Sequence, residues 1–136
     1  GEGVQDFLAA GELVPARAHQ DAERMRTLVC RGLRDAFLDH RLDAIVSPTS
    51  PVGPARAGQR ELALPGEEPR PVIDHYARLT CPFNLSGLPA LTVPCGVDAD
   101  GLPVGLQIAG RPLEEDEVLR IGATYQAHTD WHERRP

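Results

Sequence analysis

Few side chains in this sequence have the type and spacing needed for nucleophilic chemistry. Ser86 could join His75 and Asp74 in a hydrolase triad, and Cys81 or Cys95 could pair its thiol with the same imidazole. In a triad the carboxylate must hold the imidazole in one orientation, and the adjacent Asp74 and His75 cannot easily orient one another. We therefore expect neither arrangement to be catalytic.

Lysine chemistry is excluded by composition. All 14 positively charged residues are arginine, so the chain holds no lysine. A lysine general base, a Schiff base and a phosphate-binding P-loop lysine all require the ε-amino group. Any mechanism that uses such a group cannot be completed by these residues.

Two patterns suggest metal ligands without completing a site. His128 and His132 are four residues apart, as zinc ligands on a helix would be, but the glutamate of H-E-x-x-H is missing. The segment 98–101 (DADG) starts like a calcium loop and lacks the remaining ligands. We interpret these as surface residues and a turn, and we expect no metal and no cofactor.

Hydrophobic periodicity predicts a long helix in the first third of the chain. It opens at 14–16 with a proline in its first turn, buries one face that runs from Met25 to Phe37, and stops near 39–41. A short apolar strand over 42–46 follows, and the prolines at 48 and 51 should end its pairing. Glycine, proline and charge dominate 52–71, which predicts a surface loop or flap with one ordered piece at 62–64.

The second half predicts a hairpin between helices. Residues 72–79 read as a helix, 82–89 as a turn or short helix, and 90–94 and 104–109 as two strands of a β-hairpin. An acidic run at 114–117 suits the start of a last helix, whose inner face would hold Val118, Ile121, Gly122 and Tyr125. The strands lack polar alternation, yet few helices are available to cover them. We expect an α/β fold with an incomplete sheet.

Bulk properties limit the partners and the compartment. A length of 136 residues with 41% hydrophobic residues suits one unit over 1–136, and a net charge of −6 gives no attraction for nucleic acid or anionic lipid. No run approaches the roughly 20 apolar residues that span a bilayer, and the start lacks the pattern of a signal peptide. Three cysteines without C-x-x-C spacing indicate buried thiols. We expect a cytoplasmic protein.

Three segments, with their order and spacing, resemble the C-terminal region of the amidase signature family. They are PFNLSGLPA at 82–90, VPCG at 93–96 and GLPVGLQIAGRP at 101–112. Upstream, DAIV at 43–46, followed by Pro48-Thr49 and Pro51, is similar to that family's strand and Pro-Thr loop. The resemblance covers essentially the whole chain.

The resemblance implies the C-terminal part of an α/β/α sandwich with a mixed sheet. It also implies a parent that hydrolyses amide C–N bonds through an acyl-enzyme, using a nucleophilic serine, a bridging serine and a lysine. The family's lysine and its Gly/Ser-rich segment lie before the region matched here. We therefore expect no catalytic residue in this chain, inactivity in isolation, and a missing N-terminal catalytic portion as its partner.

Substrate contacts are expected at two loops. Ligands of open α/β sheets lie beyond strand ends, so Thr49, Phe83 and Asn84 are the candidate contacts to the acyl part of a small amide substrate. In the structural alternative, Asn84 and Ser86 cap a short helix and Phe83 belongs to the core, while Thr49 satisfies a turn.

Two other functions stay open. The resemblance extends to the amidase-type component of the glutamine-dependent transamidosome, which often carries an acidic residue where this chain has Ala77, five positions before Pro82. The chain could also be a non-enzymatic binding or assembly module that forms homo-oligomers through an exposed sheet.

Overall fold

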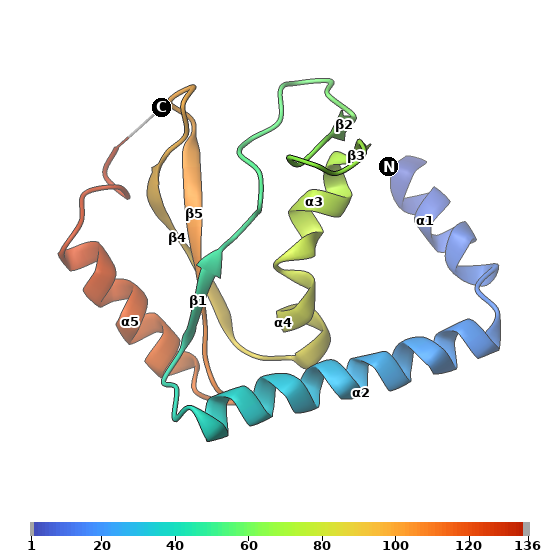
Figure 1. The fold of residues 1–136 in the computed structure, drawn as a ribbon, viewed down its shortest axis with the longest axis horizontal. Coiled ribbons are helices and arrows are strands. Elements are labelled where there is room, and N and C mark those ends of the chain that lie inside the picture. Colours follow the sequence, from blue (N-terminus) through green and yellow to red (C-terminus); the bar gives the residue numbers. More distant parts are fainter. Residues whose placement is uncertain (1, 135–136) are drawn as a thin grey trace.

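The computed structural model describes residues 2–134, and α-helices surround a small antiparallel sheet (Figure 1). In chain order the elements are α1 (Glu2–Glu12), α2 (Ala16–Asp39), β1 (Ile45–Pro48), β2 (Glu61–Leu62), β3 (Arg70–Pro71), α3 (Val72–Arg78), α4 (Cys81–Ser86), β4 (Ala90–Val97), β5 (Pro103–Ala109) and α5 (Glu115–Ala127). None of the helices in this described part is long and apolar enough to cross a membrane.

The main sheet has the strand order β1-β5-β4, and both pairings are antiparallel. The hairpin β4-β5 confirms the prediction. Helix α5 covers one face, where Val93, Ile108 and Val118 form a buried cluster against which Ile121 and Tyr125 pack. The predicted inner face of the last helix is therefore confirmed, and the acidic first turn of α5 places negative charge at the positive end of the helix dipole.

The opposite face of the sheet is tied to α3 through one buried amide. The Gln107 side-chain Nε2 donates to Ser47 Oγ on β1 at 3.2 Å and to the carbonyl of Leu79, just after α3, at 3.0 Å. Gln107 is 3% exposed, so both acceptors are held by a donor that water does not reach. This contact fixes the distance between β1 and α3.

Helix α2 confirms the predicted long helix but corrects the prediction of a buried face. Phe37 is the buried residue of α2, while Met25 and Leu28 are 60% and 58% exposed. The reason is geometric, because the N-terminal half of α2 runs beyond the sheet and packs against α4, where Arg26 Nε donates to the Leu85 carbonyl at 2.7 Å. Leu42 N bonds to the Phe37 carbonyl at 3.1 Å and closes the helix.

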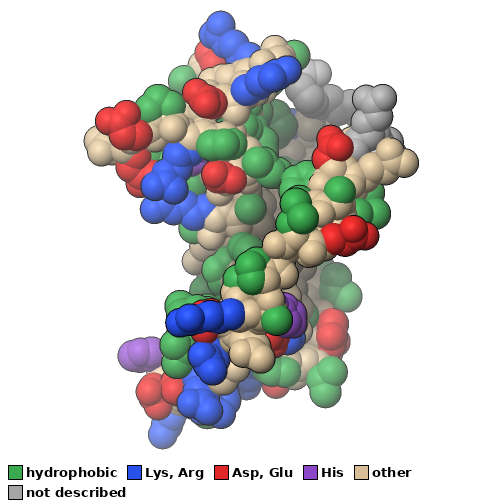
Figure 2. Space-filling view, turned by 90° about the vertical axis from the view of Figure 1, so that its right-hand side faces the viewer, with side chains coloured by type: hydrophobic (Ala, Val, Ile, Leu, Met, Phe, Trp, Pro, Cys, Tyr) green, Lys and Arg blue, Asp and Glu red, His purple; other side chains and the backbone are tan. Residues whose placement is uncertain are grey.

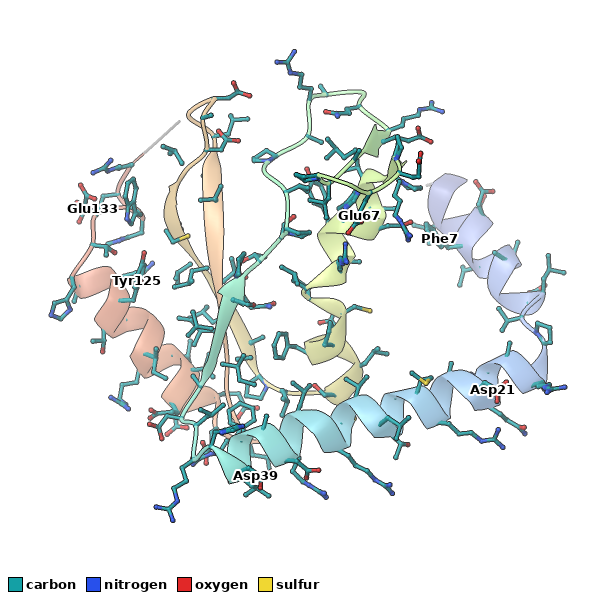
Figure 3. All side chains as sticks on the ribbon, in the orientation of Figure 1. Phe7, Asp21, Asp39, Glu67, Tyr125 and Glu133 are labelled. Atoms are coloured by element: carbon teal, nitrogen blue, oxygen red, sulfur yellow. The ribbon has the colours of Figure 1, made fainter. Side chains whose placement is uncertain are left out.

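Helix α1 was not predicted, and it exposes apolar side chains. It rises from the N-terminal end of α2, far from α5, and Phe7 and Tyr125 mark the two sides of the molecule (Figures 1 and 3). Phe7, Leu8 and Leu13 are 79%, 68% and 82% exposed. Figure 2 views this side and shows apolar side chains among the charged ones.

Strand β1 lies further along the chain than predicted. It covers Ile45–Pro48 rather than 42–46, and Thr49 N still donates to the Gly105 carbonyl at 2.9 Å. Backbone groups alternate in direction along an antiparallel strand, so Pro48 has its nitrogen on the outer edge. A proline there removes no hydrogen bond to β5, which is why it does not end the pairing. Both outer strands leave an edge unpaired within the described residues, in agreement with an incomplete sheet.

Most prolines and glycines of segment 81–97 lie at a helix end or at a bulge in a strand. Helix α4 ends at Gly87, whose φ of 71° lies in the left-handed region that glycine adopts without steric cost. Strand β4 is longer than predicted, and a bulge between Pro94 and Gly96 carries the pairing on to Val97. The cysteines are free, as expected, but they are not buried, since Cys81 is exposed and the other two are half-buried.

The segment 52–71 is anchored to α3 by three side chains of that helix. Its ordered part is the short hairpin of β2 and β3, at 61–62 and 70–71, where the sequence predicted one piece at 62–64. The fully buried His75 contacts the Leu62 carbonyl through Nε2 at 2.9 Å, the Tyr76 hydroxyl accepts from Ala55 N at 2.6 Å, and Arg78 binds Glu67 at 3.1 Å. We call 52–71 the flap from here on.

Removing the imidazole should loosen the flap. In His75→Leu the Leu62 carbonyl loses its partner, and we expect trypsin to cleave after Arg56 and Arg60 about five- to tenfold faster. Mass spectrometry of timed digests would measure this rate. Asp74→Asn, at an exposed neighbouring position, is the control and should digest like the unmodified chain. Equal cleavage of both variants would show that His75 does not hold the flap.

Candidate functional site

An open cavity of about 760 Å³ lies between the loop that follows β1 and the β4-β5 hairpin. Its wall is built from the continuous segment 46–54, Tyr76 on α3, and Thr92, Cys95 and residues 103–106 of the hairpin. The loop stands at this place because its start remains paired with β5 and because Tyr76 holds Ala55 at its far end. The cavity thus begins where β1 ends, as expected for an α/β sheet.

Thr49 is held in the cavity wall from two directions. Its amide bonds to the Gly105 carbonyl at 2.9 Å, and its Oγ1 donates to Thr92 Oγ1 at 3.3 Å. Gly105 leaves the room for this pair, since a Cβ at that position would lie 2.7 Å from Thr49 Oγ1 and 2.8 Å from Thr92 Cγ2. The two threonines and the glycine act as one packed unit.

The other hydroxyls of the wall also have partners within the chain. Ser47 Oγ accepts from Gln107, and Ser50 Oγ accepts from Val52 N at 3.2 Å. The Tyr76 hydroxyl is the acceptor for the flap. The wall is therefore mainly apolar, with a few hydroxyl groups fixed by neighbouring backbone or amide donors.

The predicted site residues do not all reach this cavity. Thr49 lines it, whereas Phe83 and Asn84 do not belong to its wall. Phe83 is 7% exposed within α4, which agrees with its structural alternative as a core residue, and Asn84 is exposed on the same helix. Ser86 Oγ donates to the Phe83 carbonyl at 3.2 Å and so satisfies the helix itself. A substrate contact by Phe83 or Asn84 stays a prediction.

The suggested nucleophile pairs are not assembled. His75 Nε2 faces the Leu62 carbonyl and Ser86 faces Phe83, so the triad of Ser86, His75 and Asp74 does not form. Cys95 Sγ lies 3.6 Å from the Val104 carbonyl. In residues 2–134 no group of three or more His, Cys, Asp or Glu side chains could hold a metal ion.

Shifted ionisations occur in surface ion pairs outside the cavity wall. The hydrogen bond from Arg120 to Glu117 raises the pKa of Arg120, and the hydrogen bond from Arg134 lowers the pKa of Asp130. Both cations belong to α5 or the segment after it. The cavity wall itself holds no arginine, histidine, aspartate or glutamate among the described residues.

Sequence reasoning missed Thr92, Tyr76 and Gly105. Thr92 and Gly105 are diagonal neighbours only because of the β4-β5 register, and Tyr76 reaches the cavity only because the flap crosses α3. The one available signal was the glycine inside the strand GLQIA, since an interior glycine often marks a close approach of another group.

Comparison with known proteins gives the family. The family model described as Amidase matches residues 4–119. An amidase of Pseudomonas putida is 37% identical over 133 residues, which cover 98% of this chain and 28% of the relative. A glutamyl-tRNA(Gln) amidotransferase component of Synechococcus sp. (strain JA-2-3B'a(2-13)) is 44% identical over 116 residues, covering 85% of this chain and 21% of that protein.

A solved amidase structure agrees in fold. It superposes with a TM-score of 0.82 at 29% identity and covers 94% of this chain and 29% of its own. The chain therefore spans between a fifth and a third of the length of these proteins. On the family match over residues 4–119, and on this agreement in fold, the chain belongs to the amidase family.

Proposed function

We propose that residues 1–136 form the C-terminal part of an amidase-signature hydrolase that cleaves amide C–N bonds through an acyl-enzyme. The observation that carries the proposal is the cavity at Thr49, which has a wall suited to an amide substrate but no base to activate a nucleophile. The chain has no lysine, and its serines are bonded within its own structure or stand in the proline-rich loop. It supplies scaffold and pocket wall.

The covalent steps fall to the portion that this chain lacks. A serine there attacks the carbonyl carbon, the C–N bond breaks, and the amine leaves with a proton. Water then cleaves the acyl ester to the carboxylic acid and regenerates the serine. The residues described here hold the acyl part, with Thr49 and Thr92 fixed by Gly105, and the start of the flap lines the cavity beside Tyr76.

The exposed apolar surface supports a partner for this chain. Phe7 and Leu8 on α1, and Leu13 just after it, are largely exposed, and the outer edge of β1 is unpaired in the described part. We propose that the N-terminal catalytic portion of the same protein covers both. A second copy of the chain is the alternative occupant, and it would make the chain an assembly module rather than part of an enzyme.

A second candidate activity follows from the 44% identity to the Synechococcus amidotransferase component. A chain of that kind would take the amide of glutamine as its nitrogen source. This chain has Ala77, half-buried on α3, at the position where the resemblance places an acidic residue in many such components. We rank the general amidase first for this reason.

A chimera tests the proposed function. The N-terminal portion of the Pseudomonas putida amidase would be joined to this chain in place of its own matched region. We expect the isolated chain to release no ammonia from simple carboxamides and the chimera to release it measurably. Hydrolysis by the isolated chain, or an inactive but folded chimera, would contradict the proposal. Sedimentation of the isolated chain would reveal self-association.

A further inference from the structure

We propose that the cavity selects amides with an uncharged, apolar acyl group and rejects those whose acyl group carries a charge. This inference rests on the proposed function and names its substrate class. Short alkyl carboxamides are the predicted substrates. Glutamine, whose acyl group carries an ammonium and a carboxylate, is predicted to be excluded.

The composition of the wall is the first argument. Sixteen residues line the cavity, and none of them has a carboxylate, guanidinium or imidazole group. Five are proline or valine residues of the 46–54 segment, and three more, Pro103, Val104 and Leu106, come from β5. A charged acyl group entering such a wall loses water without gaining a counter-charge.

Hydrogen bonding is the second argument. Ser47, Ser50, Thr92 and Tyr76 each accept a hydrogen bond from another group of the chain, so each hydroxyl keeps one proton to donate. A neutral donor suits a carbonyl oxygen. These groups cannot neutralise a carboxylate or an ammonium ion, because they carry no net charge.

Asp98 is a charged residue close to the cavity wall. A Cβ on Gly53 would lie 2.8 Å from Asp98 Oδ2, which places this carboxylate against the start of the flap. Its Oδ1 accepts from the amides of Asp100 and Leu102 at 3.0 and 2.8 Å. The carboxylate is therefore bonded to the hairpin turn, and Asp98 is not among the residues that line the cavity.

The chimera described above provides the measurement. From acetamide through propionamide to butyramide, kcat/KM should rise about fourfold for each added methylene. β-Alaninamide has the length of butyramide but ends in an ammonium group, and its kcat/KM should be at least about 100-fold lower. The kcat/KM for glutamine should be as low as that for β-alaninamide. A rate independent of acyl length would overturn the inference, because it would mean that another segment of the protein fills the cavity.

A charge placed in the wall gives a second test. Thr92→Asp adds a carboxylate at an exposed position in the cavity wall and should lower kcat/KM for butyramide about tenfold. It should also reduce the difference in kcat/KM between butyramide and β-alaninamide. Thr124→Asp, on the exposed surface of α5, makes the same substitution outside the cavity and should change neither value. Circular dichroism would check that both variants fold.

The outcomes separate the inference from the proposed function. If the chimera hydrolyses glutamine in preference to butyramide, the inference fails and amide hydrolysis stands. If the chimera hydrolyses nothing, the proposed function fails, and NMR titration of the isolated chain with butyramide and benzamide still tests the cavity. Ligand-induced chemical shift changes at the Thr49 and Thr92 amides, if they are lost in the Thr92→Asp variant, would support binding of an apolar acyl group in the cavity. Their absence in the unmodified chain would overturn it.

Discussion

Replacing Ile108 by alanine is expected to lower the free energy of unfolding by about 2–5 kcal/mol. Ile108 is 1% exposed on the central strand β5, opposite Val46 on β1 and Leu91 on β4. Its side chain belongs to the cluster that joins the sheet to Val118 of α5. Truncation removes apolar burial and leaves a cavity that the three strands cannot collapse to fill. Urea denaturation monitored by circular dichroism would measure the loss.

The control for this prediction lies on the same sheet. Val46→Ala removes methyl groups from a residue that is 56% exposed, and we expect a change within about 0.5 kcal/mol. Similar losses for the two variants would mean that α5 does not form the core with the sheet. A small loss for Ile108→Ala alone would show that its site is loosely packed in solution.

Gly105→Ala is expected to lower the free energy of unfolding by about 1–3 kcal/mol, although alanine is small. The added Cβ would come within 2.7 Å of Thr49 Oγ1, 2.8 Å of Thr92 Cγ2 and 3.3 Å of Thr49 Cβ. Threonine is branched at Cβ and has few allowed χ1 values, so the clash moves the backbone after β1. The same shift displaces Thr49 within the cavity, and NMR should record it at the Thr49 amide.

A second glycine provides the matched control. Gly32 lies in α2, and a Cβ there would meet nothing within 4 Å. Gly32→Ala should stabilise the chain by about 0.5–1 kcal/mol, because alanine has the higher helix propensity. Opposite signs for the same chemical change would establish that the close approach at Gly105 is responsible. Equal signs would refute the packed unit of Gly105, Thr49 and Thr92.

The sequence predicted the elements that local chemistry specifies. Apolar spacing defined α2 and the inner face of α5, and the turn residues at 98–101 defined the β4-β5 hairpin. The predicted boundaries of β1 were wrong, because a proline removes a hydrogen bond between strands only where its nitrogen points toward the neighbouring strand. That direction follows from the pairing with β5, which no local pattern contains.

The sequence by itself determined the family resemblance, the absence of lysine and the incomplete sheet, because each depends on residue types, spacing and periodicity along the chain. Tertiary structure alone decided that Thr49 shares a cavity with Thr92 and Tyr76 while Phe83 is buried elsewhere. It also decided that Met25 and Leu28, on the apolar face of α2, are exposed in this chain. The physical reason is that burial and proximity depend on strand register and on which elements meet, and residues far apart in the sequence acquire these relations only on folding.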